Sequence, residues 1–125
     1  MDIQELVHAQ RTYFDTGATR PYAFRLLQLK KLQQALRDNE QLLEQAMMQD
    51  FRKAPMEVYM CETGMVLEEL RFHLKHLKGW MRERAVPTPL AQFLSKSFVS
   101  PEPYGVALII SPWNYPVQLL SLIHI

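Results

Sequence analysis

The chain has 125 residues, 48% of them hydrophobic, which is enough to bury the core of one ordinary domain. Its 14 basic and 13 acidic residues leave a net charge of +1, so charge predicts neither a nucleic-acid partner nor an anionic membrane. The single Cys61 cannot form an internal disulfide, and the first residues lack the features of a secretion signal. No apolar run approaches the roughly 20 residues of a membrane-spanning helix, so we expect a cytoplasmic protein without a membrane segment.

Residues 1–84 are expected to be helical, because they contain nearly all the charges and only two of the eight prolines. A short amphipathic helix is predicted over about residues 3–14. A second helix begins near Pro21, and its apolar stripe is Tyr22, Leu26, Leu29, Leu32 and Leu36. A third covers about residues 40–49 and is expected to pack through Leu42, Leu43, Ala46 and Met47.

The longest predicted helix begins at Pro55 and ends near Arg84. Its apolar stripe repeats at spacings of three and four, through Tyr59, Thr63, Val66, Leu70, Leu74, Leu77 and Met81. Gly64 and Gly79 are expected to weaken this helix only slightly, by roughly 1 kcal/mol each relative to alanine.

Residues 85–104 are predicted to form a linker and one strand. Val86-Pro-Thr-Pro89 cannot continue a helix, because proline lacks the amide hydrogen and restricts the residue before it. Residues 93–100 alternate well enough for a strand, and both of its faces mix polar with apolar side chains. Mixed faces are typical of an edge or interface strand.

Residues 105–119 hold the segment that is most suggestive of chemistry. Gly105-Val-Ala-Leu-Ile-Ile110 is apolar without alternation, which predicts a parallel strand covered by helices on both faces. It leads into Ser111-Pro-Trp-Asn-Tyr-Pro116, a loop that presents one asparagine amide between prolines. Local chemistry alone also allows a second interpretation, in which Trp113 and Tyr115 fill a core and Asn114 caps the following helix.

Two of these motifs together resemble a signature of aldehyde dehydrogenases. Glu102-Pro-Tyr-Gly105 and Pro112-Trp-Asn-Tyr-Pro116 are similar to the family's Glu-Pro-x-Gly and Pro-Trp-Asn-x-Pro. The Asp50-Phe-Arg-Lys53 turn, the helix containing Glu62-Thr-Gly and the Val86-Pro-Thr-Pro89 linker resemble the class 3-like branch, which oxidises fatty and aromatic aldehydes. The resemblance extends to about Leu119.

The resemblance implies an α/β fold, of which this chain is an N-terminal, mainly helical fragment. That fragment includes the first parallel Rossmann-like strand, at residues 105–110. It also includes a strand similar to the bridging strands of the dimer, and a homodimer is expected for the complete enzyme.

The resemblance also implies an NAD- or NADP-dependent oxidation of an aldehyde to a carboxylate, through a cysteine thiohemiacetal and a thioester. It assigns Asn114 to the oxyanion hole, together with the backbone N–H of the nucleophilic cysteine. The nicotinamide and ribose side of the cofactor site is assigned to Ile110, Ser111, Pro112 and Trp113. The chain itself is expected to be inactive, since it has neither the nucleophilic cysteine nor the glutamate base.

Other candidate residues are expected to have no catalytic or metal-binding role. Cys61 lies early in a predicted helix, whereas the family's nucleophile lies far downstream in a glycine-containing loop. His73 and His76 are three residues apart but lack the further ligands of a metal site, so no metal is expected. Two alternatives remain open: a self-contained helical interaction module, and a fragment of an acyl-CoA-dependent member of the same superfamily.

The last six residues have an unusual sequence. Leu120-Ser-Leu-Ile-His-Ile125 is what one reading frame of a widely used transposase sequencing adapter encodes. We therefore expect residues 120–125 to be adapter translation rather than native sequence.

Overall fold

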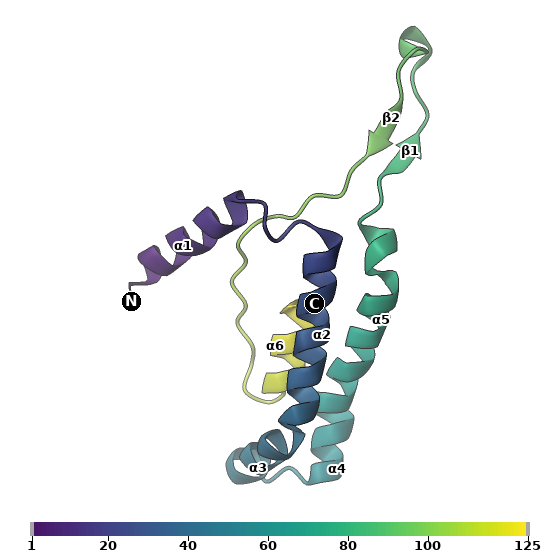
Figure 1. The fold of residues 1–125 in the computed structure, drawn as a ribbon. Coiled ribbons are helices and arrows are strands. Elements are labelled where there is room, and N and C mark those ends of the chain that lie inside the picture. The colour runs from purple at the N-terminus through teal and green to yellow at the C-terminus, as the bar shows by residue number, and fades with distance from the viewer. Residues whose placement is uncertain (1, 125) are drawn as a thin grey trace.

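The computed structural model describes residues 2–124, with the side chains of residues 2–121, and its elements are mainly helical (Figure 1). The first helices are α1 (Ile3–Asp15), α2 (Tyr22–Asp38) and α3 (Glu40–Phe51). A long helical segment follows, consisting of α4 (Pro55–Val58), the π-helical turn η1 (Tyr59–Thr63) and α5 (Gly64–Trp80). The remaining elements are β1 (Arg84–Val86), the 3₁₀ turn η2 (Leu90–Gln92), β2 (Ser97–Val99) and α6 (Pro116–His124).

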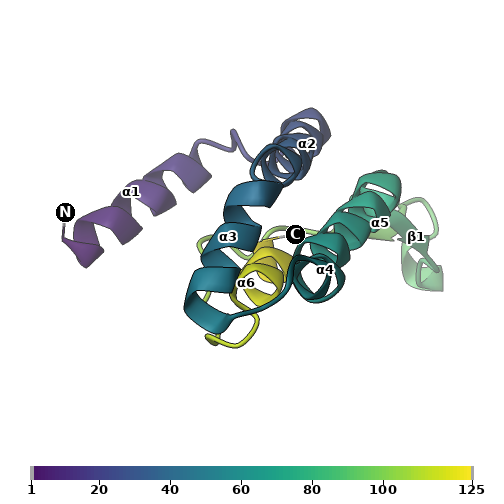
Figure 2. The same cartoon turned by 90° about the horizontal axis from the view of Figure 1, so that it is seen from below.

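The hydrophobic core lies between α2, α5 and α6, and Figure 2 shows α6 beside α3 and α4 as well. Leu36 of α2 packs with Val66, Leu67 and Leu70 of α5, and Val117 of α6 packs against this cluster. The predicted stripe of α2 is therefore confirmed at Leu36 and at two partly buried leucines that join the core, Leu29 and Leu32. The stripe of α3 is confirmed at Leu43 and Met47 and wrong at Leu42 and Ala46, which are exposed.

Helix α1 confirms the short helix predicted at the N-terminus, and a capping box of Asp2 and Glu5 closes its first turn. None of its residues is buried, and Ile3 is among the most exposed apolar side chains of the described chain. Figure 1 shows α1 pointing away from the other helices. Its apolar face is thus left uncovered within the part of the chain that the structure describes.

A π-helical turn interrupts the longest helix and shifts the phase of its buried face. Tyr59, which the constant helical spacing placed on the buried stripe, is 48% exposed, whereas its neighbour Val58 is fully buried. A π turn holds about one residue more than an α turn. A buried stripe that is traced backwards from α5 at a constant 3.6-residue period is therefore displaced by one residue on the N-terminal side of the π turn. The turn brings Gly64 so close to the Tyr59 carbonyl oxygen that a Cβ on Gly64 would lie 2.5 Å from it. Close packing therefore favours glycine at position 64, which its low helix propensity alone does not explain.

The predicted linker and strand form an antiparallel hairpin. β1 pairs with β2 in a register that places Arg84 opposite Val99 and Val86 opposite Ser97. The longest helix therefore ends at Trp80, and the strand predicted over residues 93–100 is shorter than expected. The Thr88 hydroxyl oxygen accepts a hydrogen bond from the Ser97 amide, which helps to close the loop of the hairpin. Figure 1 shows the hairpin projecting beyond the end of α5.

No strand forms at residues 105–110 in the described chain, contrary to the predicted parallel Rossmann-like strand. The only sheet of the described residues is the β1–β2 hairpin. A strand is defined by its ladder of hydrogen bonds, and these residues have no neighbouring strand to pair with. The segment instead passes the end of α1 and runs beside α2, where Gly105, Val106 and Ala107 share a pocket with Phe14 and Phe24.

Helix α6 begins directly after the proline-flanked loop and continues through residues 120–124. The assignment of residues 120–125 to an adapter, like the other segment boundaries, stays a prediction. Among the described residues, no helix is long and apolar enough to cross a membrane.

Candidate functional site

Asn114 lies at the surface, in the loop that connects the extended segment 100–110 to α6. Its neighbour Trp113 is 85% exposed, and Ile110 and Pro112 are exposed as well, while Ser111 is half-buried. The interpretation in which Trp113 fills a core is therefore wrong for this chain. The structure places all five residues predicted from the sequence on one continuous stretch before α6.

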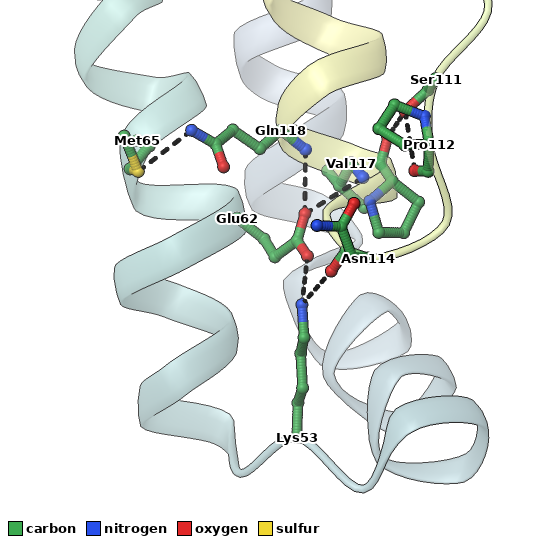
Figure 3. A network of polar contacts seen from close by, with 9 residues as sticks. Lys53, Glu62, Met65, Ser111, Pro112, Asn114, Val117 and Gln118 are labelled. Atoms are coloured by element: carbon green, nitrogen blue, oxygen red, sulfur yellow. Dashed lines mark hydrogen bonds and ion pairs between the residues drawn. The ribbon is translucent and has the colours of Figure 1, made fainter.

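The start of α6, directly after this loop, is bound by Glu62, which lies in the π turn (Figure 3). The Oε2 atom of its carboxylate accepts hydrogen bonds from the backbone amides of Val117, at 3.1 Å, and Gln118, at 2.9 Å. Helix N-termini carry unpaired amides and a partial positive charge, so a carboxylate is the group that suits this position. Glu62 thus provides the N-terminal cap of α6, a role that one alternative gave to Asn114.

Lys53 binds both Glu62 and the loop. Its Nζ donates to Glu62 Oε1 at 2.7 Å and to the backbone carbonyl oxygen of Asn114 at 2.7 Å. The same ammonium lies 4.4 Å from the centre of the Tyr115 ring, within the range of a cation–π contact. Three of its neighbours are therefore groups that an ammonium favours: a carboxylate, a carbonyl and an aromatic face.

The backbone just before Lys53 turns sharply. Arg52 ends α3 with a φ of 56°, the only positive φ of a non-glycine residue among those described. Its amide donates to the Met48 carbonyl, and the Lys53 amide donates to that of Met47, which together satisfy the end of α3. This left-handed residue lets the chain reverse between α3 and α4, so that Lys53 points toward α6 (Figure 3).

The Lys53–Glu62 ion pair is almost entirely shielded from water. The side chains are 12% and 0% exposed respectively. A buried charge is tolerated only when it is paired and its hydrogen-bonding capacity is used, and both oxygens of the Glu62 carboxylate are occupied here. The ion pair of Arg71 with Glu68 on α5, by contrast, has both side chains mainly in solvent.

Smaller contacts complete the loop. The Ser111 Oγ lies 3.2 Å from the Pro112 carbonyl oxygen and 3.3 Å from that of Pro116, so it bridges the two ends of the turn. The Gln118 side-chain amide donates to the sulfur of Met65 on α5. These contacts fix the backbone on both sides of Asn114 and leave the outer face of the loop open.

The two histidines of α5 and Cys61 lie outside this set of contacts in the described part of the chain. His73 and His76 each place Nδ1 2.8 Å from a carbonyl of their own helix, and no group of three metal-ligating side chains occurs among the described residues. Cys61 is a half-buried free thiol in the π turn.

Sequence reasoning missed Lys53 and Glu62 as parts of the site. The sequence contained only a weak sign of their role. Glu62 directly precedes Thr63, which is on the predicted apolar stripe, and a charged side chain beside a buried face needs a partner. The partner could not be found from spacing, because Val117 lies 55 residues further along the chain.

Comparisons with known proteins agree on one family. A sequence profile described as the aldehyde dehydrogenase family matches residues 1–123. The mouse protein aldehyde dehydrogenase family 3 member B2 is 41% identical over 116 residues, covering 93% of this chain and 24% of that relative. The 4,4'-diaponeurosporen-aldehyde dehydrogenase of Staphylococcus aureus is 38% identical over 118 residues, covering 94% and 26%.

A solved structure supports the same relationship. The structure described as the substrate-bound state of Staphylococcus aureus AldH matches with a TM-score of 0.90 and 38% identity, covering 97% of this chain and 27% of that one. The chain spans about a quarter of the length of these relatives. With the profile match over nearly its whole length, this chain belongs to the aldehyde dehydrogenase family.

Proposed function

We propose that this chain is the N-terminal part of an NAD(P)-dependent aldehyde dehydrogenase, in which the Asn114 side chain forms half of an oxyanion hole. The observation that carries this proposal is the placement of Asn114. Its backbone carbonyl is bound by Lys53, and the residue lies on a loop that is exposed to solvent. A donor that is fixed in advance stabilises developing charge without paying for reorganisation during the reaction.

The chemistry needs an uncharged, fixed donor. When a cysteine thiolate of the remaining part attacks the aldehyde carbon, a C–S bond forms and the carbonyl electron pair moves to oxygen. The Asn114 NH2 would donate to that oxygen, together with the cysteine's backbone N–H. The pair on oxygen then reforms the carbonyl as hydride leaves, and water hydrolyses the resulting thioester to the carboxylate. An asparagine amide suits this role because it neither carries a charge nor exchanges the proton it donates.

Residues 110–113 suit one side of a nicotinamide–ribose group. Ile110 and Trp113 expose apolar surface that a flat ring could cover, and Ser111 and Pro112 offer backbone groups. When bound, NAD or NADP would supply the hydride acceptor. The chain holds only this part of the cofactor site, which is one reason to expect that it is inactive alone.

Two other exposed segments would make contacts in the complete enzyme that this chain alone cannot supply. Residues 105–110 would become the first parallel strand when neighbouring strands supply hydrogen bonds, and the β1–β2 hairpin would bridge the subunits of a homodimer. We propose a cytoplasmic enzyme that acts on a fatty or aromatic aldehyde. The many large apolar side chains exposed on these segments argue against a self-contained helical module.

The test uses a complete enzyme, namely Staphylococcus aureus AldH with residues 1–119 of this chain in place of its own corresponding part. We expect Asn114→Ala to lower kcat by about 10²–10³, the usual loss for one oxyanion donor, with little change in cofactor affinity. Steady-state kinetics and cofactor titration would measure both quantities.

A matched control is available in Asn39→Ala. The Asn39 side chain, directly after α2, donates to the Ala35 carbonyl of that helix, so its removal should leave kcat unchanged. An unaltered kcat in Asn114→Ala, under conditions where hydride transfer limits turnover, would remove Asn114 from the mechanism.

A further inference from the structure

The buried Lys53–Glu62 pair does more than stabilise the fold. We propose that these two residues position the oxyanion donor, with Lys53 fixing the Asn114 peptide and Glu62 fixing the start of the helix that follows it. The proposal rests on the proposed function of Asn114. Neither residue touches the reacting atoms, so both are positioning residues.

Lys53 and Glu62 both bind backbone groups at or just after Asn114. The Lys53 ammonium donates to the carbonyl oxygen of Asn114 itself, so it fixes the backbone of the residue whose side chain donates to substrate. The Glu62 carboxylate binds the amides of Val117 and Gln118, the first free amides of α6 after Pro116. The Lys53–Glu62 bond joins these anchors into one unit (Figure 3).

Both residues come from unusual parts of the backbone. Glu62 belongs to the π turn, and π turns often mark functional positions in helices. The turn inserts an extra residue that brings a charged side chain into the buried face, next to Thr63, at the level of the Asn114 loop. Lys53 follows the left-handed Arg52, a conformation that costs energy in a non-glycine residue. Two locally unfavourable features thus converge on the same loop.

Apolar side chains could fill the same buried space as the Lys53–Glu62 pair. Replacing a buried ion pair by hydrophobic residues is often neutral or stabilising, so stability alone is a weak reason for such a pair. What apolar side chains cannot do is bind a carbonyl on one side and two amides on the other. The bonds that distinguish this pair all end on the backbone of residues 114, 117 and 118.

The experiment uses the complete chimeric enzyme described above. Lys53→Met alone would leave a buried carboxylate without its cation and endanger folding, so the main variant is the double substitution Lys53→Met with Glu62→Gln. It removes both charges, while the glutamine oxygen can still accept an amide of α6. We expect kcat to fall by about 10- to 100-fold, as for a misplacement of roughly 1 Å, with KM for the cofactor nearly unchanged.

A readout that a merely structural role would not affect is the coupling to Asn114. In an Asn114→Ala background the same double substitution should change kcat by less than about twofold, because no donor is left to position. An equal fall in both backgrounds would overturn the proposal, and so would an unchanged kcat in the background with Asn114.

A matched control is the exposed pair on the same helical segment. Arg71→Met with Glu68→Gln removes the same charge types without touching the loop and should leave kcat unchanged. The two proposals fail separately. If Asn114→Ala lowers kcat but the Lys53/Glu62 double variant does not, only the positioning role is lost; if Asn114→Ala has no effect, the proposed function itself is lost.

Discussion

The helices α2, α5 and α6 and the segment from β1 to Trp113 differ in how their apolar side chains are covered. Leu36, Val66 and Leu70 are buried among residues of this chain. The large apolar side chains of the second region are mainly in solvent, namely Leu90, Phe93, Leu94, Phe98, Val99, Leu108, Ile110 and Trp113. The first region is therefore specified by contacts within these 125 residues, whereas the second has the composition of an interior without the partners that would cover it.

The largest expected effect tests the first region. Leu70→Ala should lower the free energy of unfolding by about 2–5 kcal/mol, because it leaves a cavity where the side chain is completely buried. Urea unfolding of the 125-residue chain, followed by far-UV circular dichroism, measures this loss.

The control for this prediction lies in the second region. Leu94, which is 88% exposed, should tolerate Leu94→Ala within about 0.5 kcal/mol. A comparable loss in both variants would break the distinction between a covered and an uncovered region.

An intermediate effect is expected at the π turn. Gly64→Ala should cost about 1–3 kcal/mol, because the new methyl group would lie 2.5 Å from the Tyr59 carbonyl oxygen and the turn must shift. Gly79→Ala, on the same helix with open space around it, should instead stabilise the chain by up to about 1 kcal/mol. Opposite signs in thermal unfolding would show that the two glycines differ in kind; equal stabilisation by both would contradict the close approach at Gly64.

The smallest expected effect on the isolated chain is at Gly105, whose φ of 111° is disfavoured for any residue with a side chain. Gly105→Ala should cost about 1–3 kcal/mol in the complete enzyme, where neighbouring strands would hold the backbone in place. In the isolated chain the loss should stay below about 0.5 kcal/mol, because the uncovered segment can adjust. Equal losses in the two proteins, measured by chemical denaturation, would mean that this chain already holds the segment rigidly.

The sequence predicted what depends on local patterns. Helical periodicity located α1, α2, α3 and the long helix from Pro55, and the turn and strand signals located the hairpin approximately. The asparagine motif was recognised because its residues are adjacent in the chain. These features need no knowledge of which segments meet.

The features that depend on distant contacts could not be predicted. A constant period placed Tyr59 on the buried face, and only the π turn explains why Val58 is buried instead. The role of Glu62 depends on amides 55 and 56 residues away. The prediction of a strand at residues 105–110 was wrong for a related reason. A strand needs a second segment with which it forms hydrogen bonds, and a single segment of sequence does not show whether that partner is present.

The contacts that hold Asn114 also imply an order of events during synthesis. Lys53, Glu62 and the amide of Gln118 all lie within this chain, which spans about a quarter of the length of its relatives. A ribosome adds about 5–20 residues per second, and N-terminal parts are free to fold first. In a complete enzyme that begins with this chain, the loop can therefore acquire its shape while the remainder is still being translated. The proposed half of the oxyanion hole would then be finished before the nucleophile that it serves has left the ribosome.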